Sequence, residues 1–143
     1  MRPELDTALV RDFPNLYRDR NGNTMETRMC DGFATGDGWE PLIRRLSEKL
    51  EPIACEMGLY AMQVKEKFGG LRFYAGRKER GPTKLPAAIS KTVHDAISAA
   101  EEESFRTCEH CSAAGSTREY GRSWLTTLCD ACHEREVARR AGI

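Results

Sequence analysis

Two closely spaced cysteine pairs near the C-terminal end constrain the fold of this chain most. The pairs are Cys108 with Cys111 and Cys129 with Cys132, and Ser112 to Leu128 separates them. This spacing lets both sulfurs of a pair reach one side of a tight turn, so it predicts a four-thiolate zinc site. Four thiolates complete the tetrahedral coordination of zinc and leave no position for a reactive water or a substrate. We therefore expect structural Zn²⁺; redox-active or disulfide-bonded pairs are the alternative.

The residues around these cysteines predict a treble-clef-like finger. Thr117 to Tyr120 and Trp124 to Leu128 flank a glycine-containing turn and form a predicted hairpin. The second cysteine pair opens a predicted helix, Ala131 to Arg140, which a glycine follows. Amides at the start of this helix favour the thiolates of Cys129 and Cys132 and should lower the pKa of both thiols. A knuckle, a hairpin and a helix with the last two ligands make up such a finger.

The histidines and the other cysteines give weaker signals. His110 and His133 lie beside the predicted ligands and could replace one of them. Four sulfurs satisfy the metal without either histidine, so we expect neither to bind it. Cys30 and Cys55 remain as an isolated pair, and a reducing cytosol is the simplest compartment for them.

Length and charge narrow the classes of protein that fit. A chain of 143 residues fits a single domain, 1–143, which we divide into a body, 1–106, and a zinc-finger module, 107–143. Basic and acidic residues are equal in number, so no global field draws the chain to nucleic acid or to a membrane. No apolar run approaches the roughly 18 residues that span a bilayer, and the first residues lack the apolar core of a signal peptide. We expect a soluble, cytoplasmic protein.

The body reads as helices around one hairpin. Apolar residues recur at helical spacing in three segments, which we predict to be helices: Glu4 to Asp12, Asp37 to Glu51 and Ala87 to Phe105. Asp37 and Glu40 have the spacing of a capping box. Asn15 to Gly36 is polar and punctuated by glycine, so we predict a loop that is exposed and free to make contacts.

Tyr60 to Ala75 predicts a hairpin that turns at Gly69-Gly70 and pairs Phe68 with Leu71. This register places one set of apolar residues on one face: Tyr60, Met62, Val64, Phe68, Leu71, Phe73 and Ala75. The opposite face carries Gln63, Lys65, Lys67, Arg72 and Tyr74. Glu66 falls on the apolar side, where we expect a structural salt bridge, with a catalytic acid as the alternative. The predicted fold is α+β: two or three helices on the apolar face of a small antiparallel sheet, with the zinc finger at the C-terminal end.

Several motifs are distributed along nearly the whole chain: Phe13-Pro14, Asp19-Arg20, Met29-Cys30, Gly36-Asp37-Gly38-Trp39, Val64 to Tyr74, Cys108 to Cys111 and Trp124 to Cys129. Together they resemble the motifs of a family of small proteins encoded by bacteriophages and prophages, most of them without an assigned function. Family members often carry histidine at the position of Cys132, which preserves zinc binding. The C-terminal third is also similar to the zinc finger of DksA/TraR-type transcription regulators, but their acidic-tipped coiled coil has no counterpart here.

The resemblance implies a non-enzymatic phage accessory protein that binds a host protein or complex, a group that includes inhibitors of host defence such as anti-CRISPR proteins. The alternative is a nucleic-acid-binding regulator, because Lys65 to Lys84 contains seven basic and two acidic residues. The residues that either partner would contact are Lys65, Lys67, Arg72, Tyr74, Arg77, Lys78 and Arg80. A nuclease is a further alternative, but no paired histidines around the finger would activate water.

Overall fold

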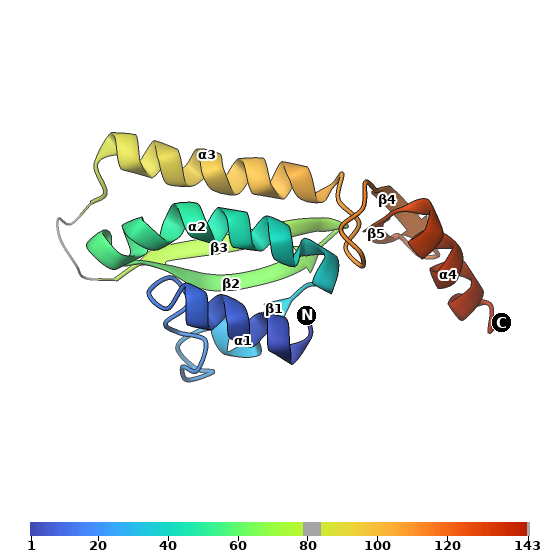
Figure 1. The fold of residues 1–143 in the computed structure, drawn as a ribbon, viewed down its shortest axis with the longest axis horizontal. Coiled ribbons are helices and arrows are strands. Elements are labelled where there is room, and N and C mark those ends of the chain that lie inside the picture. The colour runs from blue at the N-terminus through green and yellow to red at the C-terminus, as the bar shows by residue number, and fades with distance from the viewer. Residues whose placement is uncertain (79–83, 143) are drawn as a thin grey trace.

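A mixed three-stranded sheet with helices on one face forms the body of the molecule (Figure 1). The computed structural model describes residues 1–78 and 84–142. The sheet has the order β1-β2-β3, with β1 at Phe33–Ala34, β2 at Leu59–Lys67 and β3 at Gly70–Arg77. β2 and β3 are antiparallel, whereas the short β1 runs parallel to β2. The predicted α+β class is confirmed, and the parallel β1 is an addition to the predicted sheet.

The helices lie where the apolar spacing predicts them, except for the ends of the second helix. They are α1 at Pro3–Asp12, α2 at Glu40–Met57 and α3 at Ala87–Ser104. α2 begins later than the predicted Asp37 and continues past the predicted end at Glu51, through Pro52. α2 and α3 cover β2 and β3, and α1 lies beside α2 near β1 (Figure 1). In residues 1–78 and 84–142, no helix is long and apolar enough to cross a membrane.

The predicted capping box of α2 is wrong. A 3₁₀ turn, η2 at Asp37–Trp39, precedes α2, and neither element has a side-chain cap. Asp37 accepts a hydrogen bond from the backbone N–H of Arg2 at 2.7 Å. Glu40 forms an ion pair with Arg44, also at 2.7 Å. The 3₁₀ turn makes Glu40 the first residue of α2, so its carboxylate cannot reach back to a capping residue three positions earlier.

The predicted exposed loop from residue 15 to 36 is exposed in its middle part, residues 21–26, but is anchored in the core on both sides of it. It contains a 3₁₀ turn, η1 at Met29–Asp31, as well as β1. The apolar side chains Leu16, Tyr17, Met29 and Phe33 are buried, whereas Met25 is exposed. Tyr17 makes edge contacts with the rings of Phe33 and Phe73 and therefore ties this segment to the sheet. Polar and glycine residues between these anchors produced the loop-like pattern.

The predicted turn of the long hairpin is also wrong. Lys67 pairs with Gly70, so Phe68 and Gly69 form the turn, with φ of 55° and 82°. Phe68 consequently points outward and is 64% exposed. Gly70 is the first residue of β3, and a side chain has no room there because a Cβ atom would lie 2.3 Å from the ring of Phe105.

A register shift between Ala61 and Gln63 changes which residues of β2 face the core. Leu59 and Ala61 are buried, in place of the predicted Tyr60 and Met62. From Gln63 onward the predicted alternation holds, because Val64 pairs with Phe73 and both are buried. The shift fits a β-bulge, which inserts one unpaired residue into a strand.

Glu51 on α2 holds the start of the 15–36 segment. Its carboxylate accepts hydrogen bonds from the backbone N–H groups of Asn15 at 3.0 Å and Leu16 at 2.8 Å. We expect Glu51→Ala to lower the free energy of unfolding by about 2 kcal/mol, because two partly buried donors lose their acceptor. Glu48→Ala, at an exposed position of the same helix, should change it by less than about 0.5 kcal/mol. Equal urea midpoints for the two variants would contradict this role of Glu51.

The C-terminal elements follow the predicted order. β4 at Ser116–Tyr120 and β5 at Trp124–Leu128 form an antiparallel hairpin, and α4 follows at Asp130–Arg140. Figure 1 shows these elements at one end of the body, beyond the ends of β2, β3 and α3. We call residues 107–142 the cysteine module.

Candidate metal centre

The four predicted cysteine ligands meet in one cluster. The Sγ atoms of Cys108, Cys111, Cys129 and Cys132 all lie within 4.8 Å of one another. The Sγ atoms of Cys111 and Cys129 are 3.6 Å apart. Zinc–sulfur bonds of about 2.3 Å in a tetrahedron place sulfurs roughly 3.8 Å apart. The cluster could therefore hold a metal ion, and its size fits a structural zinc site.

The alternative of disulfide-bonded pairs is not what the structure contains. All six cysteines are free thiols. Cys30 lies apart from the cluster, where its Sγ donates to the carbonyl of Thr27 at 3.1 Å, and Cys55 is exposed. Neither therefore extends the ligand set.

Backbone amides and a guanidinium surround the second cysteine pair. Cys129 caps α4 and accepts a hydrogen bond from the backbone N–H of Cys132 at 3.4 Å, which lowers the pKa of its thiol to about 7, as predicted. The predicted lowering is wrong for Cys132, because burial raises the pKa of this thiol to about 12. Arg135 donates to the Cys132 sulfur at 2.9 Å and offsets part of the negative charge of a thiolate there.

The two neighbouring histidines stand outside the four-sulfur group. His133 Nδ1 lies 2.6 Å from the hydroxyl of Tyr120, which is on β4. His110 is exposed. Both placements agree with the expectation that sulfur alone completes the ligand set.

The Gly36 to Trp39 segment packs directly on the first knuckle. The backbone N–H of Gly38 donates to the carbonyl of Glu109 at 2.7 Å, and the hydroxyl of Ser112 donates to the carbonyl of Gly38 at 2.7 Å. Trp39, which is fully buried, donates its indole N–H to the carbonyl of Thr107 at 2.9 Å. A Cβ atom on Gly38 would lie 2.2 Å from the carbonyl oxygen of Cys108. The backbone of the 36–39 segment is in direct contact with the backbone of the first knuckle, so only glycine fits at position 38.

A second contact joins the module to the turn between β2 and β3. Thr127, buried on β5, donates its hydroxyl to the carbonyl of Gly69 at 2.6 Å. The backbone N–H of Leu71 donates to the hydroxyl of Ser104 at 2.8 Å, at the end of α3. Together with the contacts of the 36–39 segment, the Thr127 hydrogen bond attaches the module to the body on two sides, and the Leu71–Ser104 bond and the packing of Phe105 on Gly70 lie in the adjoining end of the body. The cysteine cluster therefore lies in a module that is held against the body, where a bound metal would stabilise the junction.

Glu109, between the first two cysteines, is a further part of this junction. Its carboxylate accepts a hydrogen bond from the backbone N–H of Gly36 at 2.9 Å. Burial raises the pKa of this carboxyl above its usual value, and the neighbouring Glu66 adds to the shift. The sequence marks Glu109 only as a residue between two ligands, so its structural role could not be inferred.

Glu66 itself does not form the predicted salt bridge within the part of the chain that the structure describes. It pairs with Leu71 across the hairpin, on the apolar side as expected. Its carboxylate accepts a hydrogen bond from the backbone N–H of Gly69 at 2.9 Å. Among the described residues, no cation forms an ion pair with it. The turn therefore uses Glu66 to satisfy one of its own amides.

Three of the predicted partner-binding residues lie together on the sheet face that the helices leave open. Lys65 pairs with Arg72 across β2 and β3, and its ammonium lies 5.8 Å from the centre of the Tyr74 ring. We call this surface the open face. Lys67 lies closer to the turn, with its ammonium 5.4 Å from the Phe68 ring centre.

The other predicted cations that the structure describes interact with carbonyl or carboxylate groups of the body. Arg77 donates from Nε to the carbonyl of Met57 at 2.8 Å, and Lys78 forms an ion pair with Asp19 at 3.2 Å. Arg72 also approaches a carboxylate, that of Glu101 on α3, at 3.9 Å. Arg80 lies outside the described residues. Of the predicted cations that the structure describes, Lys65 and Lys67 form no ion pair, whereas Arg72, Arg77 and Lys78 have partners within the body.

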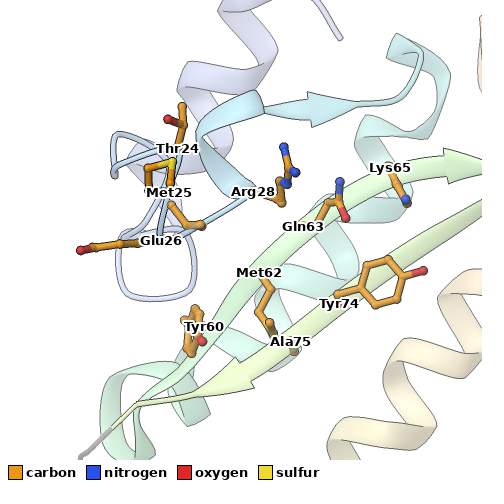
Figure 2. A pocket seen from close by; sticks show the side chains of 11 residues that line it. Thr24, Met25, Glu26, Arg28, Tyr60, Met62, Gln63, Lys65, Tyr74 and Ala75 are labelled. Atoms are coloured by element: carbon orange, nitrogen blue, oxygen red, sulfur yellow. The ribbon is translucent and has the colours of Figure 1, made fainter.

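A groove of about 610 Å³ on the open face was not predicted from the sequence (Figure 2). One wall is the segment from residue 24 to 28, and the floor comes from β2 and β3. Its lining residues are Thr24, Met25, Glu26, Thr27, Arg28, Tyr60, Met62, Gln63, Lys65, Tyr74 and Ala75. The bulge turns Met62 toward this side, and no local pattern reveals that the 24–28 segment lies across the strands from it.

Comparison with known proteins does not identify a family for this chain. No family model, curated protein or solved structure matches the chain. The resemblance to phage-encoded proteins therefore stays a prediction from the motifs, and functional inference has to start from the cluster and the open face.

Proposed function

We propose that this chain is a non-enzymatic binding protein, stabilised by structural zinc, that recognises another protein through its open face. The cluster offers four sulfurs to the ion, which is the donor set of closed structural zinc sites. In such a site the metal has no open position for chemistry. Its role is to hold the knuckle against the 36–39 segment and the hairpin against the β2–β3 turn.

The open face is the observation that carries this proposal. The described helices cover the opposite side of the sheet (Figure 1). Met62 and Tyr74 are both exposed on the uncovered side, beside Lys65. Clustered methionine and aromatic side chains are typical of protein–protein interfaces.

The motif resemblance gives this binding function a biological setting. It implies a phage or prophage accessory protein acting in the bacterial cytoplasm on a host protein or complex, as inhibitors of host defence do. A rigid scaffold fastened by a metal suits such a role, because a preorganised surface loses little conformational entropy on binding.

Nucleic acid is the competing partner, and the charge distribution favours it less. Arg72, Arg77 and Lys78 each have a carboxylate or carbonyl partner within the body. Among the described residues, phosphate binding would have to displace those partners or rely on cations such as Lys65, Lys67 and Arg28. The chain carries no net charge, so no long-range field compensates for that cost.

Affinity capture from a nuclease-treated bacterial lysate tests the proposal. We expect the wild-type chain to retain a defined protein, and Tyr74→Ala to lose it. Lys91→Glu serves as the matched control, because Lys91 is exposed on α3, away from the open face. Retention that disappears after nuclease treatment, or that Tyr74→Ala leaves unchanged, would contradict the proposal.

A further inference from the structure

We infer that the groove on the open face binds an acidic polypeptide segment that carries an apolar side chain. The inference rests on the proposed function and names the class of partner that this surface takes. It follows from the shape of the groove, the side chains that line it and the charges that remain without an ion-pair partner.

The groove has the size of a binding site for a short segment. Its volume of about 610 Å³ falls within the range of about 300–1,000 Å³ that is common for ligand sites. Figure 2 shows the 24–28 segment standing opposite the side chains of β2 and β3, so the site has a wall as well as a floor. An extended segment could lie along the strands between them.

Two methionines make part of this groove apolar. Met25 is 89% exposed and Met62 is 43% exposed, although both are large apolar side chains. Met25 comes from the wall and Met62 from the floor. Methionine is flexible and polarisable, and it is common where a surface adapts to varied apolar partners. This pair suits an aliphatic or aromatic side chain of the bound segment.

The charges around the methionines favour an acidic partner. Among the described residues, no carboxylate forms an ion pair with Lys65, whose ammonium lies at the Tyr74 ring. Arg28 reaches Asp31 only at 4.0 Å, and both side chains are mostly exposed. Glu26 is the one acidic residue among those that line the groove. A carboxylate between Lys65 and Arg28 would meet two cations whose charges are not otherwise neutralised at short range.

The tyrosine rings favour a polypeptide over single-stranded nucleic acid. The guanidinium carbon of Arg18 lies 5.2 Å from the centre of the Tyr60 ring, and the Lys78 ammonium lies 4.8 Å from it. Lys65 is placed similarly at Tyr74. A base that stacked on either ring would compete with these cation–π contacts. Carboxylates, in contrast, could bind the cations where they already lie.

Selection from a library of short random peptides, displayed and panned on the immobilised full chain, tests this inference. The three baits are the wild type, Lys65→Glu and the control Lys91→Glu, each checked for fold by circular dichroism. We expect wild type and Lys91→Glu to enrich peptides with net negative charge next to an apolar residue. We expect Lys65→Glu to bind those peptides about tenfold more weakly, because attraction becomes repulsion.

Other results would overturn the inference. Enrichment of neutral or basic peptides by the wild type would do so, as would equal binding of the acidic peptides by Lys65→Glu. Displacement of the selected peptides by oligothymidylate, with oligothymidylate binding more tightly, would identify nucleic acid as the occupant. If the lysate capture described above still retains a Tyr74-dependent protein while the peptide result is negative, the proposed function stands and only the acidic partner class is wrong.

Discussion

Replacing Cys108 by serine is expected to unfold the cysteine module and to destabilise the whole chain. Cys108 is fully buried, and its sulfur is one of the four in the cluster. Zinc binding contributes about 10–16 kcal/mol to the folding of isolated zinc-finger peptides. Even partial loss should lower the free energy of unfolding by about 4 kcal/mol or more, which corresponds to a fall of about 10 °C in Tm. Thermal unfolding followed by circular dichroism measures this change.

The chain supplies its own controls for that experiment. Cys30 and Cys55 are free cysteines away from the cluster. Cys55→Ser should shift the unfolding free energy by no more than about 0.5 kcal/mol, because it is an exposed position without a special contact. A Cys108→Ser variant as stable as Cys55→Ser would show that the cluster does not hold the fold together.

The second large effect is expected from Gly38→Ala. The new Cβ atom would lie 2.2 Å from the carbonyl oxygen of Cys108 and 2.7 Å from the backbone nitrogen of Cys111. Both contacts are with backbone atoms, so no side chain can rotate away. We expect a loss of about 3 kcal/mol, the upper part of the range for overpacking, because the knuckle and the 36–39 segment must separate.

Hydrogen exchange distinguishes separation of the junction from general unfolding. In Gly38→Ala, the backbone amides at positions 36 and 38 should exchange faster, because both donate to Glu109 across the junction, while the metal stays bound to its four cysteines. Gly142→Ala is the matched control: a Cβ atom there meets nothing within 4 Å, and only its φ of 74° is unfavourable. That strain costs about 1 kcal/mol. Equal losses of unfolding free energy in the two variants would mean that the backbone contact at Gly38 does not contribute to stability.

The sequence predicted the buried stripe of α2 and the cysteine cluster, because both follow from the spacing of residues that are close together in the chain. The apolar stripe of α2, with Leu42, Ile43, Leu46 and Leu50, is buried as its period requires. The two cysteine pairs meet because each knuckle already orients its two sulfurs, and the short hairpin between them leaves few ways to bring them together. These features needed no information about distant residues.

The features that the sequence did not reveal depend on contacts between distant segments. The turn at Phe68-Gly69 is selected in part by Phe105, which fills the space where Gly70 lacks a side chain. The role of Gly38 is set by Cys108 and Glu109, about seventy positions away in the chain. The motifs around these glycines were visible as motifs, but their shared location at the junction became clear only in three dimensions.

The groove illustrates the same limit for function. Its wall and its floor are separated in sequence, and a bulge decides that Met62 faces it. Some of the basic residues that the sequence grouped together have acidic partners, as Lys78 has in Asp19. A count of charges in one stretch does not reveal such pairs.

Metal analysis of the freshly purified, reduced protein tests the central claim most directly. Native mass spectrometry together with elemental analysis gives both the identity and the stoichiometry of the ion. We expect a single zinc ion per chain in the wild type and in Cys55→Ser, and none in Cys108→Ser. Wild-type protein that folds without a bound metal, or that carries iron in the same four-sulfur cluster, would contradict structural zinc.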